Sequence, residues 1–327
     1  MKRLGQAGFL AAAGVAVLLG TGTITHSDQP ASAPAQAAVK ISNAQAAVMG
    51  VIEGLTEYLP VSSTGHLILA GHAMGLSRFS DRPGPLGPKL AKVPAIDAFE
   101  VVIQAGAILA VAGLYRRRVA QMILGLAGRS QAGLRLLLML AVAFVPAAVV
   151  GLLLRVPIQE YLFAPVPVVI ALAVGGAAMI AAEYFCRIRK PQATRTSTLD
   201  AVSFRQALIV GLAQCLALWP GASRSMVTIV AALIAGMDMV TAAEFSFLLA
   251  LPTLGSATLY EGLKSLDALL ASAGVDGMVI GLGVSWIVAV LAVKGFLRWL
   301  TRHGLIPFGI YRLLLAGMLY AYYLLAR

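Results

Sequence analysis

Long stretches of mostly apolar residues, separated by short loops that carry Lys and Arg, dominate the chain. Six of them are roughly 16 to 23 residues long, which is enough for a transmembrane helix with some tilt. The pattern therefore predicts six full spans. They cover residues 98–115, 136–154, 163–185, 243–260, 277–293 and 305–325.

Two further apolar regions are interrupted near their middle. Residues 44–76 contain the sequence Leu59–Gly65, and residues 205–236 contain Trp219–Ser225. Proline and glycine at these points prevent a continuous helix. Each remaining arm is too short to cross a bilayer. We therefore predict two re-entrant hairpins, each a helix, a loop and a second helix.

The two hairpins align with each other without a gap. Gln45 matches Gln206 and Ser62 matches Ser223, 161 residues apart in each case. Three predicted spans follow each hairpin, and because three is odd, the second copy enters the membrane from the opposite side. Such inverted repeats bring their broken helices together near the bilayer midplane. The predicted fold is an all-α polytopic membrane protein, an inverted repeat of one re-entrant hairpin plus three transmembrane helices.

Residues 1–40 differ from the rest of the chain. Lys2 and Arg3 precede an apolar stretch and a tract rich in Ser, Pro and Ala, which is typical of a secretory signal peptide. An uncleaved N-terminal anchor helix fits the same pattern, and the alternatives stay open. The remaining chain is predicted to be one integral membrane domain, 41–327, with repeat one at about 41–190 and repeat two at about 203–327.

Composition and charge support a membrane protein. Apolar residues make up 59% of the chain and charged residues 12%, against roughly 25% charged in ordinary globular domains. A net charge of +11 would suggest nucleic acid for a soluble protein. Here the basic residues gather in the loops after residues 115, 185 and 293, which the positive-inside rule assigns to the cytoplasm. We expect no nucleic-acid partner, and nothing in the pattern predicts an oligomeric state.

Two acidic residues stand within the first hairpin. Glu53 and Glu57 are four residues apart and so share one face of a helix. Carboxylates at membrane depth are costly unless they are paired or hydrated. We therefore expect a polar cavity and a cation between these carboxylates and a substrate. A purely structural pair neutralised by a neighbouring Arg remains the alternative.

The hairpin tips combine hydroxyl groups with helix N-termini. Ser62 is a predicted N-cap, which would aim the free N–H groups of the next helix into the cavity, where they can bind phosphate. Arg224 in the second tip is permanently charged and can bind phosphate oxygens through two N–H groups, with Thr228 one turn further on the same face. His66 is either a base for a nearby hydroxyl or a structural residue.

Together these groups suit phosphoryl transfer, which requires mainly positioning and positive charge. A site within the bilayer implies a substrate with a lipid tail. A transporter or lipid flippase for an anionic substrate is the alternative, since inverted repeats are a common transporter architecture. Acid-phosphatase-like lipid phosphatases are disfavoured, because His303 has no acidic residue beside it.

Two motifs, Glu53–His66 and Pro220–Thr228, closely resemble those of the undecaprenyl-diphosphate phosphatase family, also called the bacitracin-resistance protein family. The resemblance extends over about residues 41–325 and includes Phe99–Gln104, Glu244–Ala250 and Ile306–Phe308. It implies hydrolysis of undecaprenyl diphosphate to undecaprenyl phosphate and inorganic phosphate at the outer face of the bacterial cytoplasmic membrane. This reaction recycles the lipid carrier for peptidoglycan synthesis and gives bacitracin resistance.

The resemblance also implies a role for each matching residue. Glu53 and Glu57 would form the acidic pair beside a divalent cation such as Mg²⁺ or Ca²⁺. Ser63 would be the nucleophile with His66 as its partner, although water activated by Glu57 or His66 is an open alternative. Arg224 would bind the diphosphate. The other implied substrate-binding residues are Ser62, Thr64, Gly65, Gln104, Gly221, Ser223, Ser225 and Thr228. The leader and an enlarged loop near residues 78–94 depart from the family pattern.

Overall fold

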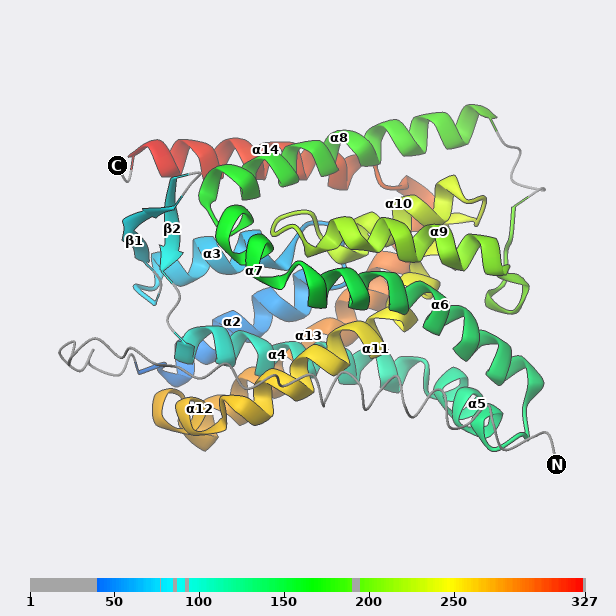
Figure 1. Cartoon of the computed structure of the whole chain (residues 1–327), viewed down its shortest axis with the longest axis horizontal. Helices are drawn as coiled ribbons and strands as arrows, with labels where there is room; N and C mark the ends of the chain where they lie inside the picture. Colours follow the sequence, from blue (N-terminus) through cyan, green and yellow to red (C-terminus); the bar gives the residue numbers. More distant parts are fainter. Residues whose placement is uncertain (1–39, 77, 85–86, 92–93, 190–194, 326–327) are drawn as a thin grey trace.

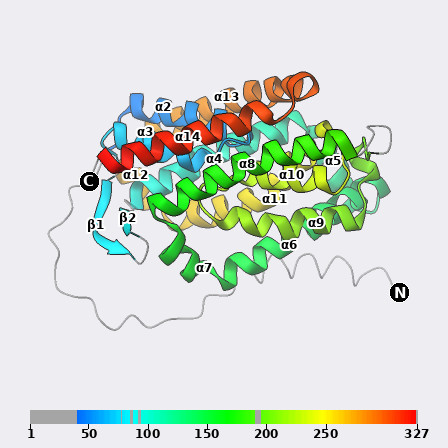
Figure 2. The same ribbon diagram turned by 90° about the horizontal axis from the view of Figure 1, so that it is seen from above.

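The computed structural model describes residues 40–76, 78–84, 87–91, 94–189 and 195–325. The predicted leader lies outside these residues, apart from Lys40. Most helices run along the longest axis of the molecule and pack side by side (Figures 1 and 2).

Helices account for nearly all of the secondary structure. In chain order the elements are α2 (Asn43–Thr56), α3 (Ser63–Ala73), β1 (Arg78–Gly84), β2 (Gly87–Ala91), α4 (Pro94–Leu114), α5 (Arg116–Leu126), α6 (Gln131–Leu153), α7 (Arg155–Pro157), the π-helical turn η1 (Ile158–Leu162), α8 (Pro165–Arg189), the 3₁₀ turn η3 (Leu199–Ala201), α9 (Phe204–Gln214), the 3₁₀ turn η4 (Cys215–Leu218), α10 (Arg224–Ile234), α11 (Met239–Lys264), α12 (Leu266–Ser272), α13 (Gly274–His303) and α14 (Ile306–Leu325).

Five described helices are long and apolar enough to cross a membrane, namely α4, α6, α8, α11 and α13. They correspond to the first five predicted spans. Large apolar side chains such as Leu152, Val174 and Leu291 are exposed on their outer faces, as expected for contact with lipid. The sixth predicted span corresponds to the helix α14, which carries Arg312 and several tyrosines. The chain is a polytopic membrane protein.

Both interrupted regions form helical hairpins. In the first, α2 and α3 enclose the tip, and the side-chain amide of Gln45 donates to the carbonyl of Met74 at 3.2 Å. In the second, α9 and α10 enclose the tip, and Gln206 donates in the same way to Ala235 at 3.3 Å. Donor and acceptor are both 161 residues apart between the copies. Each hairpin therefore starts and ends at the same side of the molecule.

The beginning of each hairpin is also repeated. Ser42 and Gln45 form a capping box at the start of α2, and Ser203 and Gln206 form one at the start of α9. A capping box satisfies two backbone N–H groups that the first turn of a helix leaves free. The sequence similarity between the copies therefore extends to the hydrogen bonds that begin each helix.

The first arm of each hairpin packs against a long helix from the other half of the chain, α2 against α13 and α9 against α6. Glycines allow the close approach. A Cβ atom at Gly50 would lie 2.6 Å from the Gly281 carbonyl oxygen, and one at Gly211 would lie 2.7 Å from the Ala143 carbonyl oxygen. Small residues at helix crossings permit such contacts in membrane proteins. The first arm of each hairpin therefore packs most extensively against the other half of the molecule.

Helices α8 and α14 form a third close pair, side by side in Figure 1. A Cβ atom at Gly176 would lie 2.7 Å from the carbonyl oxygen of Gly309. At one end of this pair the buried carboxylate of Glu183 accepts hydrogen bonds from the backbone N–H groups of Leu305 and Ile306. This carboxylate caps the start of α14, where a negative charge is favourable.

The enlarged loop near residues 78–94 contains a short antiparallel pair of strands. Arg78 pairs with Ala91 and Gly84 with Gly87, and the register is irregular between Phe79 and Pro83. This hairpin is the exception to the predicted all-helical fold. In Figure 1 it lies at the same end of the molecule as α12, opposite α5.

At the α5 end of the molecule, polar contacts join the loops next to the second hairpin to each other and to α5. Arg118 forms an ion pair with Asp200 at 2.9 Å, and the N–H of Thr196 donates to the carbonyl of Gly236 at 3.0 Å. At the opposite end, the N–H of Ile41 donates to the carbonyl of Ser272 at 2.9 Å. The hairpins therefore open towards opposite ends of the molecule.

Candidate active site

The two hairpin tips have the same backbone geometry. Ser62 has φ 75° and ψ 98°, and Ser223 has φ 69° and ψ 113°. They are the only non-glycine residues with positive φ in the part of the chain that the structure describes. Each hydroxyl accepts a hydrogen bond from an N–H group in the following first turn, so both serines are N-caps. Surrounding contacts must hold such a conformation in place, since it costs about 1–3 kcal/mol.

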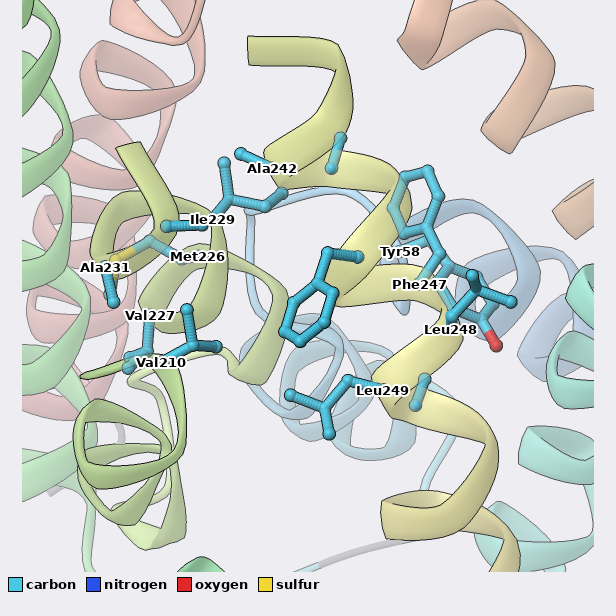
Figure 3. Packing of buried hydrophobic residues seen from close by; sticks show 14 of the residues in the cluster. Tyr58, Val210, Met226, Val227, Ile229, Ala231, Ala242, Phe247, Leu248 and Leu249 are labelled. Atoms are coloured by element: carbon cyan, nitrogen blue, oxygen red, sulfur yellow. The ribbon is translucent and has the colours of Figure 1, made fainter. Parts of the chain in front are cut away.

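An aromatic residue packs the first tip against the second half of the chain. The Tyr58 ring is fully buried and lies edge-on to Phe247 of α11, with ring centroids 5.3 Å apart. Figure 3 shows Tyr58 beside Phe247, Leu248 and Leu249. The guanidinium carbon of Arg224 lies 5.5 Å from the centroid of the same ring. This packing brings the end of α2 close to the start of α10.

The carboxylate of Glu57 joins the two tips. One oxygen accepts a hydrogen bond from the Ser63 hydroxyl at 2.8 Å, and the other binds an Arg224 N–H group at 3.0 Å. Only 6% of the Glu57 side chain and 10% of the Arg224 side chain are exposed. Ser63 and Arg224 are equivalent positions of the two repeats, each the first residue of its helix. A hydroxyl group, a carboxylate and a guanidinium group therefore meet in one largely buried place.

Further hydroxyl groups surround Arg224. Its guanidinium donates to the carbonyl of Ser246 at 3.0 Å, and the Ser246 and Thr228 hydroxyl oxygens are 2.6 Å apart. Ser225 donates to the carbonyl of Leu59 in the other tip at 2.9 Å, and its hydroxyl oxygen lies 3.0 Å from that of Ser223. The sequence analysis did not single out Ser246, although this residue lies within Glu244–Ala250, one of the stretches that resemble the family.

His66 has other partners than Ser63. Its Nδ1 lies 2.7 Å from the carbonyl oxygen of Ser62, which can only accept, so this nitrogen carries the proton. Its Nε2 lies 2.6 Å from the Tyr311 hydroxyl oxygen and accepts from that hydroxyl when the imidazole is neutral, and the two rings are stacked. Within the described residues no hydrogen bond joins His66 to Ser63. The acceptor for the Ser63 proton in this arrangement is Glu57.

Glu53 is almost completely buried, and its Oε1 has no hydrogen-bond partner among the described residues. It interacts electrostatically with Glu57, Glu100 and Arg224. Neighbouring carboxylates with a free oxygen suit a hard divalent cation. No group of three or more His, Cys, Asp or Glu side chains in the described ranges is arranged to hold a metal ion on its own. Water or phosphate oxygens would have to complete the coordination, as is usual for Mg²⁺.

The other predicted substrate-binding residues are placed differently. Thr64 is exposed and Gly65 is buried at the start of α3. Gly221 has φ 91°, and a Cβ atom there would lie 2.6 Å from the Val168 carbonyl oxygen, so the second tip requires glycine. Gln104 accepts a hydrogen bond from Thr258 at 3.1 Å, which links α4 to α11. No hydrogen bond between described residues joins Gln104 to either tip.

Sequence reasoning also missed Arg312. This side chain is fully buried in α14, and it donates to backbone carbonyls of both tips and of α8. A lone arginine inside a predicted span is a signal that could have marked it, because such residues are rare and usually functional.

Known proteins are similar to this chain over most of its length. Residues 46–318 match the family model described as bacitracin resistance protein BacA. The chain is 47% identical over 274 residues to an undecaprenyl-diphosphatase of Sorangium cellulosum, and the match covers 84% of each chain. It is 42% identical over 281 residues to an undecaprenyl-diphosphatase of Rhizorhabdus wittichii, covering 86% of this chain and 97% of that protein. Undecaprenyl-diphosphatase 1 of Chromobacterium violaceum is 41% identical over 266 residues, with 81% and 91% covered. The chain therefore belongs to the bacitracin resistance protein BacA family.

Proposed function

We propose that this protein hydrolyses undecaprenyl diphosphate to undecaprenyl phosphate and inorganic phosphate. The reaction recycles the lipid carrier for peptidoglycan synthesis and gives resistance to bacitracin. The names of the relatives support this reaction. The observation that carries the proposal is the Glu57 carboxylate, which binds the Ser63 hydroxyl with one oxygen and the Arg224 guanidinium with the other.

In the first step the Ser63 oxygen attacks the terminal phosphorus. The hydroxyl proton passes to Oε2 of Glu57, which already accepts it in a 2.8 Å hydrogen bond. The bond between the terminal phosphorus and the bridging oxygen breaks, and undecaprenyl phosphate leaves with the electron pair of that bond. The terminal phosphoryl group remains on Ser63 as a phosphoserine.

In the second step a water molecule attacks the phosphoserine. The new P–O bond forms as the bond to the Ser63 oxygen breaks, and the proton held by Glu57 returns to that oxygen. Inorganic phosphate leaves with the atoms of the water molecule. If water instead attacks the diphosphate directly, one of its protons passes to Glu57, the bond between the terminal phosphorus and the bridging oxygen breaks in a single step, and Ser63 acts only as a ligand of the substrate.

Arg224 links substrate binding to the base. A diphosphate in the site competes with Glu57 for the guanidinium, because phosphate oxygens accept two of its N–H groups at once. When Arg224 turns to the substrate, Oε1 of Glu57 loses its partner, while Oε2 keeps its contact with the Ser63 hydroxyl. The N-termini of α3 and α10 add partial positive charge close to the same anion.

A divalent cation fits the acidic side of the site. Glu53 and Glu57 would hold Mg²⁺ or Ca²⁺, with Glu100 nearby. When bound, the cation neutralises phosphate oxygens and so stabilises the negative charge of the leaving group. The free Oε1 of Glu53 supports this assignment.

The protein is proposed to lie in the bacterial cytoplasmic membrane as an inverted repeat, with the active site open to the exterior. The end with α5 and the start of α9 would face the cytoplasm, because most of the described basic residues of the loops lie there. The lipid-diphosphate substrate would reach the tips from the surrounding bilayer.

The proposal is tested by phosphate release from undecaprenyl diphosphate by the purified protein in detergent. We expect release, its loss with a chelator, and recovery with Mg²⁺ or Ca²⁺. A lack of release with every cation, together with lipid movement in vesicles, would instead support the flippase alternative.

The nucleophile is tested with Ser63→Ala. If Ser63 attacks phosphorus, this variant loses turnover, and a phosphoserine that can be trapped by acid quench in the wild type is absent from it. Substantial turnover by the variant would support direct attack by water.

A further inference from the structure

Arg312 makes an unusual set of contacts in the middle of α14. The side chain is fully buried, and each hydrogen bond that it donates within the described chain goes to a backbone carbonyl. The acceptors come from three separate segments. They are Pro60 of the first tip at 3.5 Å, Gly221 and Ala222 of the second tip at 2.9 and 3.1 Å, and Ala171 and Leu172 of α8 at 3.1 and 3.3 Å.

This arrangement requires a guanidinium group. A buried charge in a membrane protein is costly, and here the described residues supply no carboxylate to Arg312. The planar fork of arginine has five N–H donors, which can reach acceptors in several directions at once. A lysine has three donors on a single atom, and a neutral side chain has fewer. No shorter or uncharged residue can bind the same three segments together.

Helix α8 leaves space for the guanidinium at Gly175. A Cβ atom at that glycine would lie 3.0 Å from Cζ of Arg312 and 2.7 Å from Cε of Met226. Both distances are too short for an unstrained contact. The position of Arg312 therefore depends on a glycine in one neighbour as well as on carbonyl groups in the tips.

We infer that Arg312 is a positioning residue that fixes the two hairpin tips to each other. Pro60 is three residues before Ser63, and Ala222 is two residues before Arg224. By holding the carbonyls of both segments, Arg312 sets the distance between the Ser63 hydroxyl and the Arg224 guanidinium, which meet only at Glu57. The effect on turnover rests on the proposed function, whereas the effect on tip geometry does not.

The geometry is tested without substrate, by electron paramagnetic resonance distances between the tips. Spin labels are placed at Thr64→Cys and Leu216→Cys, two exposed positions next to the first and second tip. The native Cys186 and Cys215 are replaced in this background. We expect a narrow distance distribution with Arg312 present, and a broader or shifted one with Arg312→Gln.

Glu183→Gln is the matched control. Glu183 is as deeply buried as Arg312 and anchors the same helix, α14, but it does so at the Leu305 and Ile306 N–H groups, away from the tips. We expect Glu183→Gln to lower the thermal unfolding temperature while the tip distance stays as in the wild type. If Arg312→Gln does not fold, Arg312→Lys and Gly175→Ala serve in its place.

Kinetics separate positioning from stability. Per folded enzyme, we expect Arg312→Gln to lower kcat by about 100-fold, the size of effect that a displacement of about 1 Å can have. The KM should change less than kcat, Arg312→Lys should recover part of the rate, and Glu183→Gln should keep the wild-type kcat. An unchanged tip distance in folded Arg312→Gln overturns the inference. If the tip distance changes in Arg312→Gln but the wild-type protein releases no phosphate, only the proposed function is contradicted.

Discussion

Glu57 has two carboxylate oxygens, and each has a different partner on a different hairpin tip. This explains why a carboxylate is required at the position. An amide of the same shape could accept from one partner only, and it could not take up the Ser63 proton. The residue is therefore both the proposed base and the link between the two halves of the site.

Glu57→Gln should lower kcat by about 10²- to 10⁴-fold, the usual contribution of a general base. It should also lower the thermal unfolding temperature, because Arg224 then keeps a buried charge without its partner. Phosphate release and thermal unfolding of the purified variant measure both effects. Glu160→Gln, at an exposed position of η1, is the control and should behave as the wild type.

The roles of Glu57 and His66 can be told apart. Since His66 binds Ser62 and Tyr311 rather than Ser63, we expect His66→Gln to reduce kcat at least about tenfold less than Glu57→Gln does. Tyr311→Phe should have a smaller effect still. A loss in His66→Gln equal to that in Glu57→Gln would identify the histidine as the base.

The sequence predicted most of the residues at the tips but not how they pair. Ser63 and His66 are close along the chain, which suggested a nucleophile and its base. In the structure they are the first and fourth residues of α3, and the histidine ring stacks on Tyr311 of α14. Which distant helix a side chain meets depends on tertiary packing, and no local pattern records it. Arg312 could have been marked as a lone arginine in a predicted span, but its contacts with both tips could not be predicted from the sequence.

At the scale of elements, the sequence was more informative. Proline and glycine within apolar stretches predicted both breaks, and the spacing of 161 residues extends to the capping boxes and to the closing hydrogen bonds of Gln45 and Gln206.

The strands β1 and β2 were not predicted. Proline in their sequences argues against strands, and it is tolerated here because this pair has only two strands, both at an edge.

The crossings between hairpin arms and long helices depend on glycine. Gly50→Ala and Gly211→Ala should each destabilise the protein by about 1–3 kcal/mol, because the added methyl group meets a backbone carbonyl. Thermal unfolding in detergent measures the change. Gly283→Ala in α13 is the control, since nothing lies within 4 Å of its Cβ position, and it should be neutral or slightly stabilising. Equal unfolding temperatures for all three variants would contradict the packing described.

At the scale of the whole molecule, charge distinguishes the two ends. The described basic residues at the end with α5 and the start of α9 include Arg116, Arg117, Arg118, Arg129, Arg135, Arg195 and Arg205, whereas Lys40, Arg155 and Lys264 lie at the opposite end. By the positive-inside rule, the α5 end would face the cytoplasm. This is the orientation expected from the loops in the sequence, and it stays a prediction.

The orientation is tested with single cysteines in a background without Cys186 and Cys215. A membrane-impermeant maleimide added to intact spheroplasts should label Lys264→Cys and should reach Arg129→Cys only after lysis. Both positions are exposed. The reverse labelling pattern would place the active site on the cytoplasmic side.

The equivalence of Ser63 and Arg224 implies a division of labour between the two copies of the hairpin. One backbone position carries the proposed attacking group in the first copy and the proposed anion-binding cation in the second. Glu57, the acid that contacts both within the described residues, belongs to the first copy. A chain made of two first halves would lack the cation, and a chain made of two second halves would lack the nucleophile and the base. Neither half is a small enzyme by itself, so separately expressed halves should show activity only when they assemble.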